Sequence, residues 1–143
     1  MDRLSVRRRS ALMRRVRGKN TGPELLMRRL LSAGGYRYRK DYILHPHSLP
    51  GTPDVAFPAR RRVILVHGCF WHAHKCRYGR APKSHRAFWS AKRRENRERD
   101  RRTRVRLRRR GWTVLTVWQC QLRRHPGDLA AKVGAFLGPA TKR

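Results

Sequence analysis

The amino-acid sequence predicts an α/β (α+β) fold, and three features of the chain support this. Two short apolar runs, residues 53–57 and 62–66, lie on either side of the basic turn 58–61, as in a β-hairpin. Residues 85–110 contain neither glycine nor proline, which is typical of one long helix. Residues 112–118 are rich in the β-branched and aromatic side chains that favour strands.

The chain of 143 residues is expected to form a single domain, 1–143, because domains usually contain about 100–200 residues. We see no internal repeat and no linker. The arginine-rich arm 1–9 and the segment 139–143 are expected to be flexible. A short helix is expected through residues 11–16, and it forms either a clamp on a nucleic-acid backbone or part of a frayed tail.

The first long helical segment begins near Thr21. Thr21 and Glu24 have the spacing of a capping box, in which each side chain bonds the other residue's backbone N–H. Leucines at helical spacing follow, and Gly34 and Gly35 end the predicted helix. Helix capping is a sufficient structural explanation for Glu24, so a functional role for this residue needs separate support.

Asp54 lies at the start of the predicted hairpin, after an expected edge strand at 36–39 and a loop that holds His45 and His47. The two histidines are interpreted as loop residues. An antiparallel hairpin brings Asp54 close to Val66. A carboxylate at the start of a buried strand is costly unless it is paired or binds a metal. Asp54 is therefore either a metal ligand or a turn cap.

The long helix is predicted to turn its least charged stripe toward the sheet. Asp100 lies on this stripe and is expected to point inward; the alternative is a surface ion pair with one of the many arginines. Glu95 and Glu98 lie off the stripe and are expected to pair with arginines. The stripe consists of Trp89, Asn96, Asp100, Thr103 and Leu107.

Gly111 ends the long helix, the strand 112–118 follows, and Cys120 comes just after that strand. Pro126 is suited to begin a last helix. The apolar residues of that helix share one face and indicate core packing only; they are Leu129, Val133, Phe136 and Leu137.

The charge balance is extreme, with 38 basic and eight acidic residues and a net charge of +30. A surface this basic fits a polyanion such as DNA or RNA. No apolar run approaches the roughly 20 residues that span a bilayer, and no signal peptide is visible. We therefore expect no membrane partner and a cytoplasmic, nucleoid-associated protein.

Three cysteines are an odd number for a disulfide framework, and clustered thiols in a reducing compartment more often bind metal. Cys69, His74, Cys76 and Cys120 form a set of four ligands that suits tetrahedral Zn²⁺ in a structural site. Two alternatives stay open: the thiols are unrelated, or His72 replaces His74 as the fourth ligand.

His67 and His72 flank the zinc set near Asp54, and histidine can act as a general base near neutral pH. With Asp100, these residues suit Mg²⁺-assisted hydrolysis of a phosphodiester. Phe70 and Trp71 either stack on bases or form a small core around the zinc, and Trp89 can join either role.

These motifs resemble the very short patch repair (Vsr) DNA mismatch endonucleases. The resemblance covers roughly residues 10–123, and the run His67-Gly-Cys-Phe-Trp-His72 is highly specific. The matching segments are 17–21 with Glu24, 50–54, 66–76, 88–89, 96–100, 111–112 and 118–120.

The resemblance implies a fold like the type II restriction-endonuclease core, with a mixed central β-sheet flanked by helices and a structural zinc site. It implies an enzyme that nicks one strand of DNA next to the thymine of a T:G mismatch, which arises when 5-methylcytosine deaminates. Partners implied are double-stranded DNA with such a mismatch, and a functional link to a cytosine-5 DNA methyltransferase and mismatch-repair proteins. We expect a monomer because the lesion is asymmetric.

Residue roles follow from the same resemblance. Mg²⁺ is held by Asp54 and the backbone carbonyl of Val66, His67 and Asp100 bind metal-coordinated water or phosphate, and His72 is the general base. Glu24 hydrogen-bonds within the site. The zinc ligands are Cys69, His74, Cys76 and Cys120. The DNA-binding residues are the aromatic wedge Phe70, Trp71 and Trp89, together with Asn96.

The chain departs from the family pattern at Gln119, where the family often has Glu, and at Ala73 and Lys75. Residues 40–49 look longer than usual, and the arginine load is high. Two other functions remain: a related nuclease with another DNA target, and a zinc-stabilised DNA-binding protein without activity.

Overall fold

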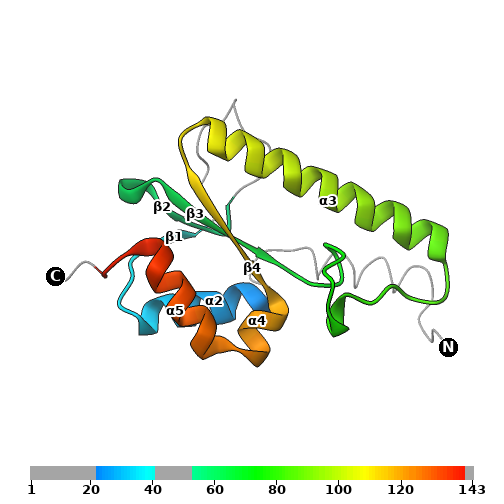
Figure 1. Ribbon diagram of the computed structural model, residues 1–143, viewed down its shortest axis with the longest axis horizontal. Coiled ribbons are helices and arrows are strands. Elements are labelled where there is room, and N and C mark those ends of the chain that lie inside the picture. Colours follow the sequence, from blue (N-terminus) through cyan, green and yellow to red (C-terminus); the bar gives the residue numbers. More distant parts are fainter. Residues whose placement is uncertain (1–21, 41–52, 141–143) are drawn as a thin grey trace.

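The computed structural model describes residues 22–40 and 53–140, and they form a mixed α+β fold around a four-stranded sheet (Figure 1). The strand order is β1-β2-β3-β4, with the first two pairings antiparallel and the β3–β4 pairing parallel. The strands are β1 (Arg39–Lys40), β2 (Val55–Phe57), β3 (Arg62–His67) and β4 (Thr113–Trp118). The helices are α2 (Gly22–Ala33), α3 (Arg86–Arg109), α4 (Gln119–Arg124) and α5 (Pro126–Leu137), with 3-10 turns at Pro58–Arg60 and Arg77–Gly79.

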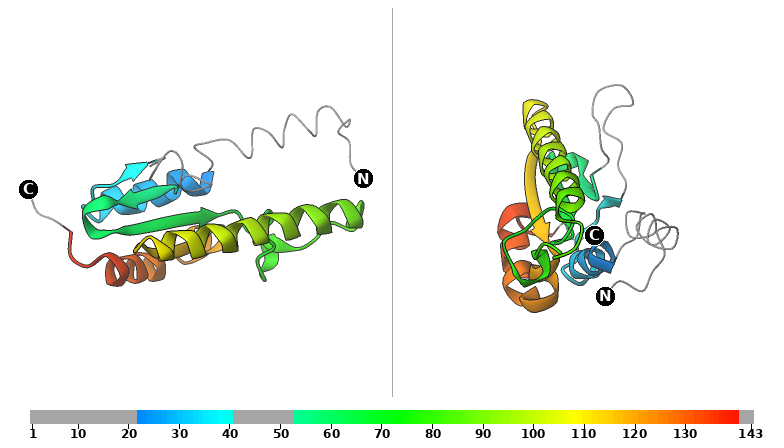
Figure 2. Two further views of the ribbon diagram at one scale, coloured as in Figure 1. Left: turned by 90° about the horizontal axis from the view of Figure 1, so that it is seen from above. Right: turned by 90° about the vertical axis from the view of Figure 1, so that its right-hand side faces the viewer.

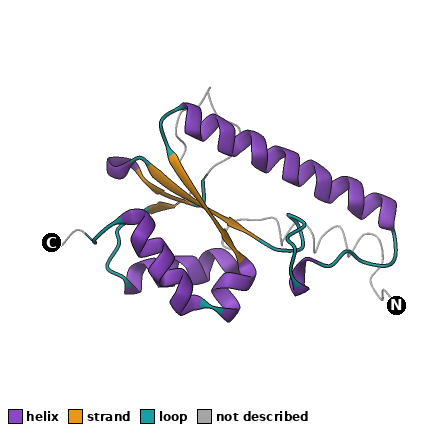
Figure 3. Cartoon of the chain, viewed as in Figure 1, coloured by secondary structure: helices purple, strands orange, loops and turns teal. Residues whose placement is uncertain are grey.

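Helices lie on both faces of the sheet, α3 on one and α2, α4 and α5 on the other (Figures 1 and 3). Successive residues of a strand point to opposite faces. In β3, Val63 and Leu65 pack with Leu107 of α3. Ile64 and Val66 point the other way, into the larger core that α2 and α5 complete. The apolar run of β3 is thus buried on both sides.

Helix α3 crosses from the end of β3 back to the start of β4, which makes the two strands parallel. Its C-terminal half packs on the sheet through Leu107. Its N-terminal half extends beyond the strands and lies over the segment that follows β3 (Figures 1 and 2). No helix among the described residues is long and apolar enough to cross a bilayer.

The structure confirms the hairpin, the long helix, the strand predicted at 112–118, which is β4, and the last helix, whose Leu129, Val133 and Leu137 are buried. The expected edge strand 36–39 is displaced: the edge strand β1 is Arg39–Lys40, and the Tyr36 hydroxyl instead donates to the Gly138 carbonyl at 2.5 Å. Helix α4, which contains Cys120, was not predicted.

Several sequence predictions lie outside the described residues. They concern the arm 1–9 with the short helix after it, the capping residue Thr21, the loop with His45 and His47, and most of the flexible segment 139–143.

Candidate active site and metal site

The candidate site lies where β3 and β4 end side by side. The strand register pairs His67 with Trp118, so the residues that follow each strand meet at one edge of the sheet. Asp54, just before β2, reaches the same edge and accepts a hydrogen bond from the Val66 backbone N–H at 2.7 Å. The predicted proximity of Asp54 and Val66 is therefore confirmed.

Three predicted residues form a compact group, the histidine cluster: His67, His72 and Asp100, with one ligand atom from each within 4.8 Å of the others. The two imidazoles stack at a centroid distance of 4.0 Å and 4° between planes. Asp100 Oδ2 bonds His72 Nδ1, and Asp100 Oδ1 lies 3.8 Å from His67 Nε2. Asp100 thus points inward from α3, as predicted, while Asp54 is not a member of this group.

His67 is only 5% exposed. Burial, and then the neighbouring charge of His72, lower the pKa of His67 to about 4, although the Asp100 carboxylate opposes this change. Within the described part of the chain, His67 Nδ1 is buried and has no hydrogen-bond partner. The ring is therefore neutral near pH 7, and a neutral imidazole nitrogen is able to bind a metal or accept a hydrogen bond.

A second group, the sulfur cluster, gathers Cys69, His74, Cys76 and Cys120 with ligand atoms within 4.8 Å of one another. Cys120 Sγ lies 3.6 Å from His74 Nδ1, and the Cys120 backbone N–H donates to Cys69 Sγ at 3.4 Å. All three thiols are free of disulfides. Burial, with contributions from the other thiols, raises the pKa of Cys69 to about 12, so a metal that binds here must displace its proton.

The two histidines whose roles were left open lie in different groups: His74 belongs to the sulfur cluster and His72 to the histidine cluster. Trp118 contacts both groups, because its ring stacks on His74 with 4.1 Å between centroids and lies edge-to-face with His67 at 5.3 Å. The two clusters thus share one aromatic wall. Gln119, a departure from the family pattern, accepts the Cys69 N–H at 3.4 Å through Oε1.

The predicted aromatic residues also gather. Phe70, Trp71 and Trp89 form an edge-to-face cluster with centroid distances of 5.2–5.8 Å. Phe88 extends it, 5.0 Å from Trp89, and is 55% exposed. Phe88 lies in a segment that matches the family, and no role was predicted for it from the sequence, although its position next to Trp89 was a usable signal.

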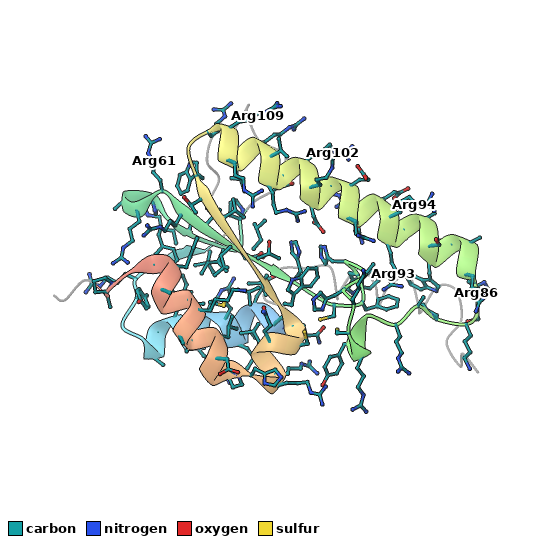
Figure 4. All side chains as sticks on the ribbon, viewed as in Figure 1. Arg61, Arg86, Arg93, Arg94, Arg102 and Arg109 are labelled. Atoms are coloured by element: carbon teal, nitrogen blue, oxygen red, sulfur yellow. The ribbon has the colours of Figure 1, made fainter. Side chains whose placement is uncertain are left out.

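Arg93 is a residue that sequence reasoning missed. It is buried, and its guanidinium donates from Nε to the Phe70 carbonyl at 2.8 Å and from Nη2 to the Gly79 carbonyl. Figure 4 shows it reaching from α3 toward the segment below. Asn96 Nδ2 donates to the Trp71 carbonyl at 3.0 Å. The Arg93 and Asn96 side chains together fix residues 68–79, here named the metal loop, to α3.

Glu24 is on α2, and its Oε2 lies 3.6 Å from Arg28 one turn further along. Its part in the site stays a prediction, as does the DNA contact of Asn96, whose amide bonds the metal loop.

Comparisons with known proteins point in the same direction. The family described as "DNA mismatch endonuclease Vsr" matches residues 1–78. The type II nicking enzyme V.XorIIP of Xanthomonas oryzae pv. oryzae is 51% identical over 97% of this chain and 98% of that protein. The DNA mismatch endonuclease Vsr of Escherichia coli is 42% identical over 80% of this chain and 71% of that protein. This chain therefore belongs to the Vsr family of DNA mismatch endonucleases and is a strand-nicking enzyme.

Proposed function

We propose that this protein is a Mg²⁺-dependent endonuclease that nicks one strand of duplex DNA next to the thymine of a T:G mismatch. The observation that carries the proposal is the histidine cluster, which lies at the same sheet edge as Asp54 and close to the aromatic cluster. Family membership and the name of the Escherichia coli relative support the mismatch as substrate.

The donor groups at this edge fit a hard divalent cation. Asp54 supplies a carboxylate beside the backbone of Val66, whose carbonyl would be a second oxygen ligand, and Mg²⁺ prefers oxygen ligands. These two residues would hold the ion. When bound, Mg²⁺ stabilises negative charge on a phosphoryl oxygen and favours deprotonation of water.

His72 is the proposed general base. Asp100 accepts from Nδ1 of His72, which fixes the ring and leaves Nε2 as the nitrogen that takes a proton. The Asp100 carboxylate also stabilises the imidazolium that results. His67 stacks on the same ring and, being neutral, is suited to bind water or phosphate rather than to repel a cation.

We propose that the sulfur cluster holds Zn²⁺ in a structural role. Three thiols and one imidazole complete a tetrahedral set and leave no open coordination position. By resemblance, the mixed sheet with helices on both faces belongs to the restriction-endonuclease-like core. Phe70, Trp71 and Trp89 are proposed to enter the duplex next to the mismatch.

Nicking of a T:G duplex and of a matched T:A duplex, with and without Mg²⁺, tests this function. We expect a nick beside the thymine in the T:G duplex only, and only with Mg²⁺. Equal nicking of both duplexes would instead indicate a nuclease with a different DNA target.

Asp54→Asn and His72→Gln are expected to abolish nicking while retaining affinity for the duplex. Asp128→Asn, a substitution of an acid on the first turn of α5, serves as the matched control and keeps full activity. Nicking that survives Asp54→Asn would contradict the proposed metal ligand.

A further inference from the structure

A large groove lies between α3 and the metal loop and continues from the histidine cluster. It has a volume of about 1150 Å³, and its walls include His72, Asp100 and Trp118. Six arginines of α3 and one lysine of the metal loop also line it, against only two carboxylates, those of Glu98 and Asp100. The walls therefore carry a strong excess of positive charge.

Three of these arginines, Arg97, Arg101 and Arg104, form an arginine row along one side of α3. Their spacings of four and three residues match the helical repeat, so they follow one another on a single face. Arg97 and Arg101 are exposed and Arg104 is half-buried. Within the described residues, none of the three forms an ion pair with a carboxylate. The nearby Asp100 carboxylate bonds His72 instead.

The positive charges in this groove lie close enough to oppose one another. Burial, and then the charge of Arg97, lower the pKa of Arg93, which lines the same groove. Such mutual repulsion is relieved when a polyanion supplies regularly spaced negative charges. A DNA strand is such a polyanion, because it carries one phosphate for about every 3.4 Å of helix axis.

The arginine row extends over about 10 Å at 1.5 Å per residue, which matches the span of several successive phosphates. The groove also contains the residues proposed to act on the scissile phosphate, His72 and Asp100, and along α3 Asp100 lies between Arg97 and Arg104. A strand whose scissile phosphate lies there is thus able to continue along α3. The opposite side of α3 faces away from the groove, and it carries Arg102 and Arg109 (Figure 4).

We propose that the arginine row binds successive backbone phosphates of the nicked strand, close to the nick. The identity of that strand rests on the proposed function, whereas the binding of phosphates by the row does not. In this role the row contributes affinity without reading sequence, since contacts to phosphates carry no base information.

The first test replaces the row with alanine, as Arg97→Ala/Arg101→Ala/Arg104→Ala, and measures affinity for a duplex without a mismatch across a salt series. The control, Arg102→Ala/Arg106→Ala/Arg109→Ala, has the same spacing and loses the same charge from the other side of α3. Each lost phosphate contact lowers the slope of log K against log salt by about 0.9. The row variant should lose about 2.7 in slope. If the two proteins bind equally at 1 M salt, the variant should then bind about 10²-fold more weakly than the wild-type protein at 0.15 M salt.

The control should keep the slope of the wild-type protein, and both variants should retain the wild-type melting temperature. Equal slopes for the two triple variants would overturn the role of the row. This outcome is independent of whether the enzyme selects T:G mismatches, so the two proposals fail separately.

The second test identifies the strand. Single methylphosphonate linkages, which remove one phosphate charge, are placed along either strand of a T:G duplex, and binding is measured without Mg²⁺. Neutral linkages close to the nick in the nicked strand should weaken binding of the wild-type protein several-fold and leave the row variant unaffected. If only linkages in the complementary strand have this effect, the assignment of the row to the nicked strand is wrong.

Discussion

Replacement of Arg93 by methionine should loosen the metal loop while keeping much of the buried side-chain volume. Arg93 is 9% exposed, and its guanidinium bonds two carbonyls of the metal loop, those of Phe70 and Gly79. The guanidinium also lies 5.4 Å from the centre of the Phe70 ring. Methionine fills a similar space but offers no donor, so both carbonyls lose a charged partner.

The expected cost follows from those contacts. A hydrogen bond from a charged donor contributes about 1.5–3 kcal/mol, which gives about 3–6 kcal/mol for two. Removal of a buried charge recovers part of this, because burial of the guanidinium is itself unfavourable and lowers its pKa. We therefore expect the free energy of unfolding to fall by about 2–4 kcal/mol.

Urea denaturation of the zinc-loaded protein measures this change, with Arg102→Met as the control from the opposite side of α3. The control should stay within about 0.5 kcal/mol of the wild-type protein. A second measurement uses 2-aminopurine beside a T:G mismatch, whose fluorescence reports unstacking by the aromatic cluster. Arg93→Met should reduce this signal, and Arg93→Lys, which retains one cationic nitrogen that donates hydrogen bonds, should restore part of it. Equal stability of Arg93→Met and Arg102→Met would refute the reasoning.

Three further predictions concern the loop, the histidine cluster and the sulfur cluster. Gly79→Ala should displace the metal loop and lower zinc affinity, because a Cβ at this position would lie 1.9 Å from the His74 carbonyl oxygen. The control Gly127→Ala has open space around its Cβ, so its effect on stability should be neutral or stabilising by about 0.4–1 kcal/mol. Zinc titrations and thermal melts of both variants measure these effects. The metal-free protein should lose stability as the pH falls from 6.5 toward 4, by up to about 3 kcal/mol, because buried His67 stays neutral while the unfolded chain takes up a proton. Urea titrations across this pH range measure the change, and His67→Gln should flatten the pH dependence. A His67→Gln variant with the same pH profile as the wild-type protein would contradict the prediction. Cys120→Ser should cost folding more than chemistry, and a folded, zinc-free and fully active variant would rule out a structural metal.

Local patterns were sufficient to predict the elements that carry the site. The apolar runs on either side of Pro58 to Arg61 predicted the hairpin, and with it the approach of Asp54 to Val66. Helical spacing placed Asp100 on the inward stripe of α3, where it bonds His72. These features depend on neighbours in sequence, which is why periodicity revealed them.

Other features depend on contacts that no local pattern encodes. Arg93 was not predicted, because its acceptors are backbone carbonyls 23 and 14 residues earlier, and a charged residue on an arginine-rich helix suggests a solvent-exposed side chain. The division of His72 and His74 between two clusters also needed coordinates, since the spacing allowed either residue beside the thiols.

The crossover from β3 through α3 to β4 has a consequence for how the enzyme is made. His67 and Cys69 come from the end of β3, Asp100 from α3, and Cys120 from beyond β4. During translation, therefore, the growing polypeptide has no complete set of site residues until the ribosome has released the segment that pairs with β3. A translation product that ends before β4 lacks both the strand that pairs with β3 and the ligand Cys120, so we expect it not to nick DNA.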